Sequence, residues 1–205
     1  MSSIDTHYGG SILVMRGKDA IVITADRRFG NGPATQHCGF SRLYTLTPNV
    51  VIGLACFVPD CQIIFKELRK HANMFRLSQS REIEPQEVAS LLSYILYSKR
   101  FSPYYIDPIV TGFDRSGKSH IYTMDCIGCI STPPWFATAG TAAKNLTGIS
   151  ETLYEEGMET EDLFTTSVQA FLNAVDRDAL SGWGAESMIL TPQQHIHREI
   201  VGRMD

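Results

Sequence analysis

The sequence of 205 residues lacks both a long hydrophobic run and a large excess of charge of one sign. No apolar stretch approaches the roughly 20 residues that a membrane-spanning helix needs. The 18 basic and 22 acidic residues give a formal net charge of −4, without the basic character typical of nucleic-acid-binding proteins. We therefore expect neither a membrane nor a nucleic acid among the partners.

Cysteine is scarce, and the chain begins without the apolar core of a signal peptide. An odd number of cysteines, five, in a chain without such a leader favours reduced thiols inside a cell over a disulfide framework. The 43% of hydrophobic residues is ordinary for a globular protein. At this length, the composition predicts a single domain with a sizeable core.

Hydrophobic periodicity divides the chain into blocks of strands and paired helices. We expect helices from an Asp60 N-cap to Phe75, from Pro85 until Pro103 stops the helix, from Thr141 to Tyr154, and from Thr160 to Val175. We expect strands at Ser11–Met15, Ala20–Ala25, Pro33–Cys38, Leu43–Leu46, Val50–Phe57, Asp107–Phe113, Ser119–Met124, Trp135–Ala139, Glu186–Leu190 and His195–Val201. The first two strands should form a hairpin, and the third and fourth a second pair.

The order of these elements indicates the fold class. Because the helices come in pairs rather than singly between strands, a doubly wound parallel sheet is disfavoured. The order favours an α+β fold in which two antiparallel sheets stack face to face and a helix pair covers each outer face. The nearly all-apolar strand Val50–Phe57 should be buried on both faces, between a helix layer and the other sheet.

Several motifs narrow the interpretation further. Gly9-Gly10-Ser11 opens the first strand, Thr24-Ala25-Asp26-Arg27-Arg28 closes the first hairpin, and the segment Asp176–Gly184 (DRDALSGWG) follows the fourth helix. Together they resemble β-type subunits of the 20S proteasome, from about Tyr8 to the C-terminus. The segments Lys99–Tyr105 and Asp125–Cys129 and the ending Arg203-Met204-Asp205 are similar to the type-3 β subunits in particular.

This resemblance implies the four-layer αββα sandwich of the N-terminal-nucleophile hydrolases, in agreement with the order of elements. It divides the chain into a short N-terminal extension, residues 1–9, and a proteasome β-type domain, residues 10–205. In active members of the family, processing exposes an N-terminal threonine. Its hydroxyl attacks the peptide carbonyl while its own α-amino group serves as the base.

The resemblance places Gly10 at the position of that nucleophile, and glycine has no side chain with which to attack. Asp26 matches the aspartate of the active pattern. Arg42 stands near the position of the catalytic lysine, and a guanidinium keeps its charge at any relevant pH. Asp178 and Ser181 match the second half of the pattern. We therefore predict a degenerate site whose remaining residues form a structural polar cluster.

One alternative is an active peptidase that uses Ser11 as its nucleophile. In this sequence Ser11 is the only hydroxyl beside Gly10. A shift of one residue along a strand would, however, point the side chain to the opposite face of the sheet. Where the active pattern has a serine after the strand Trp135–Ala139, this chain has Thr141.

The resemblance also implies a role for the segment that contains Asp125 and Cys129. In the family, the matching segment faces the neighbouring trypsin-like subunit and helps to line a pocket for a substrate side chain. A carboxylate at this place would favour basic substrate side chains by charge complementarity. The other interpretation is that Asp125 is a surface residue at the end of a hairpin.

A second alternative from a different class is a metal-binding or redox module that uses Cys126 and Cys129. A redox pair with this spacing usually lies where a strand enters a helix, whereas this pair lies between two predicted strands. A zinc site would need two further ligands, for which His195 and His197 are the candidates on one predicted strand.

A magnesium ion is the one cofactor that the resemblance allows. Family members bind magnesium at the turn that matches Asp178–Ser181, and backbone carbonyl oxygens suit this hard cation. The terminal Asp205 carries two carboxylates and is a further candidate ligand. No cofactor is required for the expected function.

The sequence thus predicts a non-catalytic structural subunit of the proteasome β ring. Such a subunit would support assembly and ATP- and ubiquitin-dependent protein degradation, and would shape the pocket of its trypsin-like neighbour. The resemblance implies a hetero-oligomer of stacked α7β7β7α7 rings. The partners would be other β subunits of the same ring, an α-ring subunit and a β subunit of the opposite ring. The expected location is the cytoplasm and the nucleus.

Overall fold

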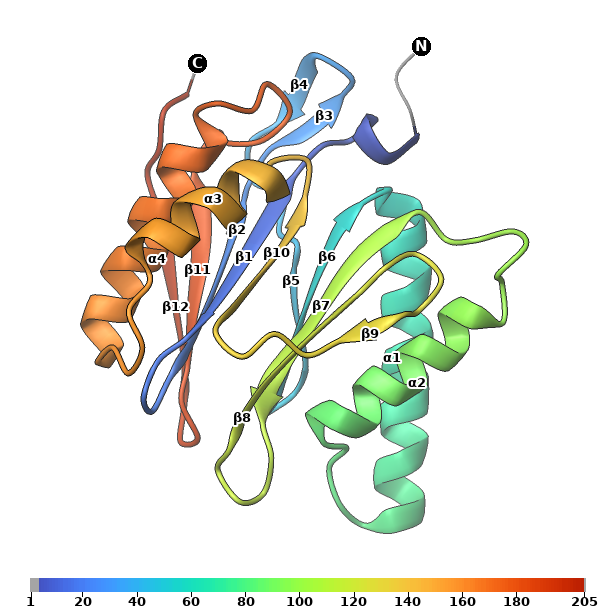
Figure 1. Ribbon diagram of the computed structural model, residues 1–205. Helices are drawn as coiled ribbons and strands as arrows, with labels where there is room; N and C mark the ends of the chain where they lie inside the picture. The colour runs from blue at the N-terminus through green and yellow to red at the C-terminus, as the bar shows by residue number, and fades with distance from the viewer. Residues whose placement is uncertain (1–3, 205) are drawn as a thin grey trace.

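The computed structural model describes residues 4–204, and its two sheets lie between two pairs of helices (Figure 1). The strands of the first sheet, in spatial order, are β10 (Phe136–Gly140), β1 (Ser11–Arg16), β2 (Ile21–Asp26), β11 (Ala185–Leu190) and β12 (His195–Ile200). Those of the second are β5 (Leu43–Thr47), β6 (Val50–Cys56), β7 (Ile106–Phe113), β8 (Ser119–Met124) and β9 (Ile130–Ser131). All neighbouring strands in both sheets are antiparallel.

The helices form the two outer layers. The helices α1 (Val58–Gln79) and α2 (Pro85–Tyr97) pack on the second sheet, and α3 (Ala143–Leu153) and α4 (Thr160–Val175) pack on the first. This arrangement confirms the predicted αββα sandwich. Within residues 4–204, no helix is both long and apolar enough to cross a membrane.

Alternation along the strands divides the buried residues among three layers of core. On β6, Val50 and Ile52 belong to the cluster under α1 and α2, whereas Val51 belongs to the cluster between the sheets. The predicted burial of this strand on both faces is thereby confirmed. On β1, Ile12 faces the other sheet and Leu13 faces α3 and α4, because successive side chains of a strand point to opposite faces.

The predicted second pair of strands is wrong. The strand β4 (Ala34–His37) pairs with β3 (Phe29–Asn31), in a small hairpin outside both sheets, and β5 pairs with β6. The sequence did not indicate β3, because three residues with a glycine in the middle show no alternation of apolar side chains. The edge strand β9 was also not predicted, because its two residues are too few to show a pattern.

Two predicted helix boundaries are also wrong. Helix α1 begins at Val58, so Asp60 lies in its first turn and is not its N-cap. The Asp60 carboxylate instead accepts a hydrogen bond of 2.9 Å from the backbone N–H of Tyr105. Helix α2 begins at Pro85 as predicted but ends at Tyr97. Pro103 lies further along the chain and is therefore not what ends the helix. Tighter turns end it, since the N–H groups of Lys99 and Arg100 each bond to the carbonyl three residues earlier.

Candidate functional site

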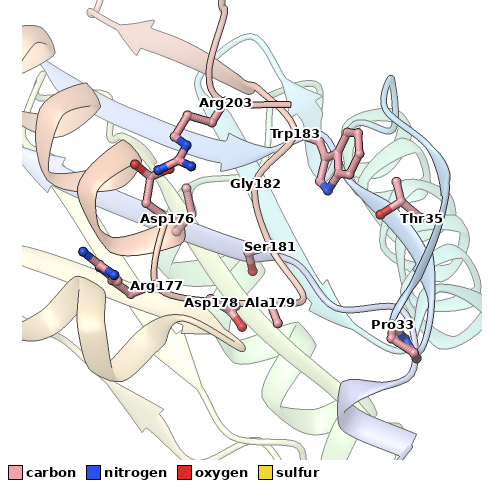
Figure 2. A pocket seen from close by; sticks show the side chains of 11 residues that line it. Pro33, Thr35, Asp176, Arg177, Asp178, Ala179, Ser181, Gly182, Trp183 and Arg203 are labelled. Carbon is pink, nitrogen blue, oxygen red and sulfur yellow. The ribbon is translucent and has the colours of Figure 1, made fainter. Parts of the chain in front are cut away.

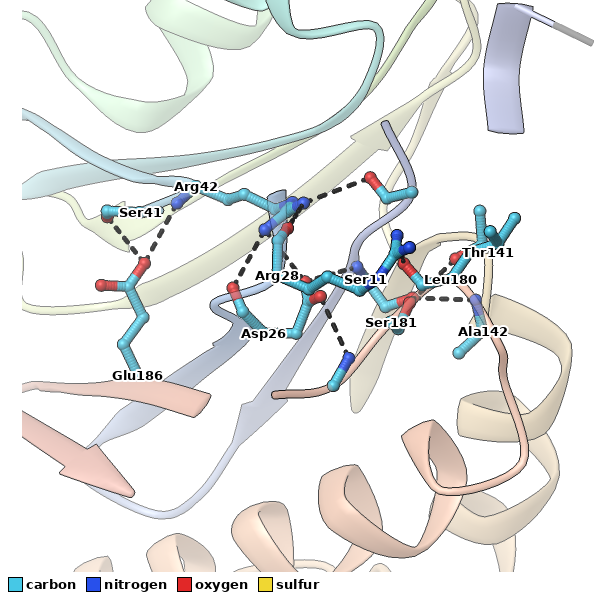
Figure 3. Close-up of polar contacts among 12 residues, drawn as sticks. Ser11, Asp26, Arg28, Ser41, Arg42, Thr141, Ala142, Leu180, Ser181 and Glu186 are labelled. Carbon is cyan, nitrogen blue, oxygen red and sulfur yellow. Dashed lines mark hydrogen bonds and ion pairs between the residues drawn. The ribbon is translucent and has the colours of Figure 1, made fainter. Parts of the chain in front are cut away.

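The predicted site residues meet at the end of the sandwich where β1 begins (Figure 3). Antiparallel pairing of β1 with β2 places the end of β2 beside the start of β1. The backbone N–H of Ser11 donates to Asp26 Oδ1 over 2.9 Å. Arg42 immediately precedes β5, and the turn after α4 contributes Asp178 and Ser181. The structure therefore brings together residues that are up to 171 positions apart in the sequence, from Gly10 to Ser181 (181 − 10).

An ion pair between Asp26 and Arg42 lies at the centre of this group. Arg42 Nη1 is 3.2 Å from Asp26 Oδ1, and the two side chains are only 1% and 0% exposed. Burial raises the pKa of Asp26, while the guanidinium and the N–H groups of Ser11 and Gly182 favour the carboxylate and oppose that shift. A buried ion pair of this kind is costly to break, because the remaining charge has no water to solvate it.

Arg42 also donates hydrogen bonds to three backbone carbonyls, which belong to two segments of the chain. Its Nη1 reaches the carbonyl of Asp26 at 3.1 Å, and its Nη2 reaches those of Gly9 at 3.3 Å and Arg28 at 2.5 Å. The guanidinium thus joins the N-terminal segment to the end of β2. Together with the ion pair to Asp26, these hydrogen bonds give Arg42 a structural role, because they hold backbone segments in place.

Gly10 has neither an attacking atom nor room for one. Its φ of +107° is a conformation that residues with a side chain rarely adopt, and a Cβ at this position would overlap the guanidinium of Arg42. Its N–H donates to the carbonyl of Leu180 over 3.1 Å, and its own carbonyl accepts from the N–H of Thr141 over 3.0 Å.

A chain of hydroxyl groups occupies the second half of the site. Thr141 Oγ1 donates to Asp178 Oδ2 over 2.5 Å and lies 2.8 Å from Ser181 Oγ, which is in turn 2.8 Å from Ser11 Oγ. The backbone N–H of Ala142 donates to Ser11 Oγ over 2.8 Å. The hydrogen bonds can therefore all run in one direction, from Ala142 to the carboxylate. Each hydroxyl in this chain already has a partner on both sides.

Ser11 is poorly placed to act as the alternative nucleophile. Its side chain is fully buried, and it points to the face of β1 that also carries Leu13, toward α3 and α4. A side chain at Gly10 would point to the other face, toward Arg42. The expected change of face by one residue is thus observed.

Residues 7–9 of the N-terminal extension pack against the site. The N–H of Gly32 donates to the carbonyl of His7 over 2.8 Å, and the N–H of Gly30 donates to that of Tyr8 over 3.3 Å. The Tyr8 ring stacks on Phe29 with ring centres 5.2 Å apart. Together with the bond from Arg42 to Gly9, these contacts hold the extension along β3 and over the start of β1.

Two residues of the cluster were not predicted from the sequence. Arg28 is fully buried, and its guanidinium donates to the carbonyls of Leu180 and Gly32 over 3.2 and 2.9 Å. Glu186, on β11, accepts hydrogen bonds from the backbone N–H of Arg42 over 3.0 Å and from the hydroxyl of Ser41 over 2.6 Å. A signal for Arg28 existed, because it belongs to the motif that closes the first hairpin.

The turn after α4 also borders a hollow of about 600 Å³ (Figure 2). The side-chain oxygens of Asp178 and Ser181 are already engaged in the hydroxyl chain. A magnesium ion at this turn would therefore depend on backbone carbonyl oxygens, as the sequence analysis expected, and that ion stays a prediction. Asp205, the other candidate ligand, lies outside the described residues.

Asp125 and Cys129 lie in the exposed loop between β8 and β9. Asp125 Oδ1 accepts hydrogen bonds from the backbone N–H groups of Ile127 and Cys129, over 3.1 and 2.8 Å. The hydroxyl of Ser93 on α2 donates to the carbonyl of Gly128 over 2.6 Å. The loop is thereby fixed, with the Asp125 and Cys129 side chains at the surface.

The proposed zinc ligands are not brought together. Cys126 and Cys129 lie beside β9, at one edge of the second sheet, whereas His195 and His197 lie on β12, at one edge of the first. His197 Nε2 instead lies 3.3 Å from Glu186 Oε2. Among residues 4–204, no three side chains of histidine, cysteine, aspartate or glutamate gather in a way that could hold a metal ion.

The stacked sheets and the partly retained polar pattern at the start of β1 define an N-terminal-nucleophile hydrolase fold. A family model described as "Proteasome subunit" matches residues 6–190, and the chain belongs to this family. It is 39% identical to proteasome subunit beta type-3-A of Arabidopsis thaliana over 203 residues. Identity is 37% over 203 residues with the beta type-3 subunit of Picea mariana and 36% over 204 residues with that of Drosophila melanogaster.

Each of these alignments covers 99% of this chain and 100% of the relative. The resemblance to β-type proteasome subunits, and most of all to type 3, is therefore confirmed over the full length of the chain.

Proposed function

We propose that this chain is a non-catalytic structural subunit of the β ring of the 20S proteasome. The observation that carries the proposal is Gly10, which occupies the nucleophile position without a side chain and without space for one. The docked extension supports it, since its contacts favour retention of residues 7–9 over processing. Asp26 and Arg42 then serve to hold the N-terminal segment, β2 and β5 together.

Exposed apolar side chains support the proposal that this chain is part of a larger assembly. Leu77 is 82% exposed, Tyr94 75% and Phe101 92%, all on or next to α1 and α2. Exposed apolar side chains of this size are candidates for burial against neighbouring subunits. We propose that other β subunits, an α subunit and a β subunit of the opposite ring cover the surface of this chain, in an α7β7β7α7 particle of the cytoplasm and nucleus. The cysteines form no disulfide within the described residues, which agrees with a reducing compartment.

The native mass of the chain purified from its own cells tests this assembly. We expect the chain to be recovered in a large particle, in fixed proportion to several other subunits. Recovery of the chain as a stable free monomer of 22.8 kDa would contradict the proposal.

We also propose that Asp125 and Cys129 contribute to the substrate pocket of the neighbouring trypsin-like subunit. The exposed, fixed loop supports this role, because a rigid carboxylate at the surface can complement a basic side chain bound next door. The carboxylate also stabilises its own loop, so a test must separate its charge from its hydrogen bonds.

The substitution Asp125→Asn makes that separation. The amide oxygen of asparagine can still accept from the N–H groups of Ile127 and Cys129, whereas the negative charge is lost. We expect assembled particles with unchanged subunit content and about three- to tenfold slower cleavage after basic residues, the size of a contribution of ~1 kcal/mol from one charge. Asp162→Asn, at an exposed position on α4, is the matched control. If both variants cleave such substrates like the unaltered particle, the pocket role is wrong while the structural role stands.

A further inference from the structure

Arg16, another arginine with a buried guanidinium nitrogen, lies at the far end of β1. Six residues of strand place it on the order of 20 Å from the cluster at Gly10. Its backbone is fixed on both sides, because its N–H donates to the carbonyl of Trp135 over 2.8 Å and its carbonyl accepts from the hydroxyl of Tyr154 over 2.7 Å. The position of this side chain is therefore well defined by the fold.

The guanidinium of Arg16 is only partly satisfied. Nη2 donates to the carbonyl of Ser119 over 2.9 Å, which links the two sheets, but Nε is buried and has no hydrogen-bond partner. Burial lowers the pKa of Arg16, and no carboxylate forms an ion pair with it in the part of the chain that the structure describes. A buried donor without an acceptor typically costs ~1–3 kcal/mol, so an oxygen ligand would be stabilising here.

Arg16 lines a pocket of about 240 Å³ that also contains Lys118, Ser119, His120 and Thr132. No ion pair of Lys118 occurs within residues 4–204. His120 is already engaged, since Asp114 Oδ2 lies 2.9 Å from its Nε2 and the hydroxyl of Tyr122 lies 3.3 Å from its Nδ1. No acidic residue lines the pocket, in a chain whose formal net charge is −4.

We propose that this pocket binds a small tetrahedral oxyanion of the phosphate class. Arg16 and Lys118 supply two positive charges that match a phosphate dianion, and the hydroxyl-bearing Ser119 and Thr132 are further donors. These groups come from β1, from the turn into β8 and from the segment between β9 and β10, so they surround a ligand from different directions. The guanidinium of Arg16 lines the pocket, and arginine favours bidentate donation to a ligand of this kind.

Inorganic phosphate, titrated against the full-length chain as it is purified, tests this site. Phosphate should raise the unfolding midpoint more than sodium chloride of equal ionic strength does. It should also slow modification of Arg16 by phenylglyoxal at least threefold, as followed by mass spectrometry of the peptide that contains it. We expect Lys118→Gln to weaken phosphate binding about tenfold, as the loss of one charge-assisted contact implies.

Lys118→Gln is the safer variant because its side chain lies at the surface, whereas Arg16→Gln removes a contact between the sheets. Lys144→Gln, an exposed position on α3, makes the same change of charge away from the pocket and should bind phosphate normally. The proposal is wrong if phosphate has no more effect than chloride, if acetate is as effective as phosphate, or if Lys118→Gln binds phosphate as tightly as the unaltered chain.

Discussion

Replacement of Gly10 by alanine should destabilise the chain by more than about 3 kcal/mol. The added methyl group would overlap the guanidinium of Arg42, which is buried and paired with Asp26. Moving the guanidinium breaks a buried ion pair, a change that costs about 3–5 kcal/mol, and the positive φ adds strain of about 1–2 kcal/mol. Because folded domains are stable by only about 5–15 kcal/mol, we expect little of the variant to enter assembled particles.

Gly32→Ala separates the effect of the overlap from that of the backbone conformation. Gly32 also has a positive φ, of +57°, but a Cβ there meets no atom within 4 Å. Urea unfolding of the full-length variants should give a small loss for Gly32→Ala, of about 1–2 kcal/mol, and a much larger one for Gly10→Ala. Equal losses would show that Arg42 does not fill the nucleophile position.

The second large effect is expected from Arg42→Met, which removes the guanidinium but keeps much of the volume. The change leaves the Asp26 carboxylate buried without its partner and removes the hydrogen bonds to the carbonyls of Gly9 and Arg28. We expect a loss of about 3–5 kcal/mol in the free energy of unfolding at neutral pH. The N-terminal extension should also become accessible to proteases, since Arg42 holds Gly9.

The loss for Arg42→Met should depend on pH. Burial already raises the pKa of Asp26, and without the guanidinium that pKa rises further above the value of about 3.9 in the unfolded chain. The folded state then holds a proton that the unfolded state releases, so stability falls as pH rises from about 4 through the folded pKa. The variant should therefore be less stable at about pH 8 than at about pH 5, relative to the unaltered chain.

A double substitution provides the control for this pair. Asp26→Asn combined with Arg42→Met removes both charges, and replacing both members of a buried ion pair is less costly than removing one. The double variant should be more stable than Arg42→Met alone at about pH 8, with a coupling of at least ~1 kcal/mol in the cycle. Strict additivity would mean that the two side chains do not act as a pair.

The sequence predicted the layers of the fold because its apolar periodicity is strong where the core is. The strand β6 and the helix α4 are long enough for the pattern of apolar residues in the sequence to predict which side chains are buried. The hairpin β3–β4 was not predicted, because it lies outside both sheets and buries little. Its pairing is set by backbone hydrogen bonds, which leave no pattern of side chains.

The candidate site was predicted by resemblance rather than by periodicity. Asp26, Asp178 and Ser181 belong to motifs, and the resemblance put Arg42 near the lysine position, so their proximity could be anticipated and is observed. The sequence could not predict that Arg42 fills the space beside Gly10, because this depends on the direction of its side chain in three dimensions. The unpaired Nε of Arg16 could not be anticipated either, since it depends on how the side chain lies between β1 and β8.

Intact-mass analysis of this subunit after the assembled particle is treated with an epoxyketone inhibitor tests the central claim most directly. Such inhibitors react with a free amine and the hydroxyl next to it on one N-terminal residue, and Gly10 has no hydroxyl. We predict that the subunit keeps its N-terminal extension, with Tyr8 and Gly9 still attached, and gains no mass, while catalytic neighbours in the same particle are labelled. A chain that begins at Ser11 and carries the inhibitor would contradict the account.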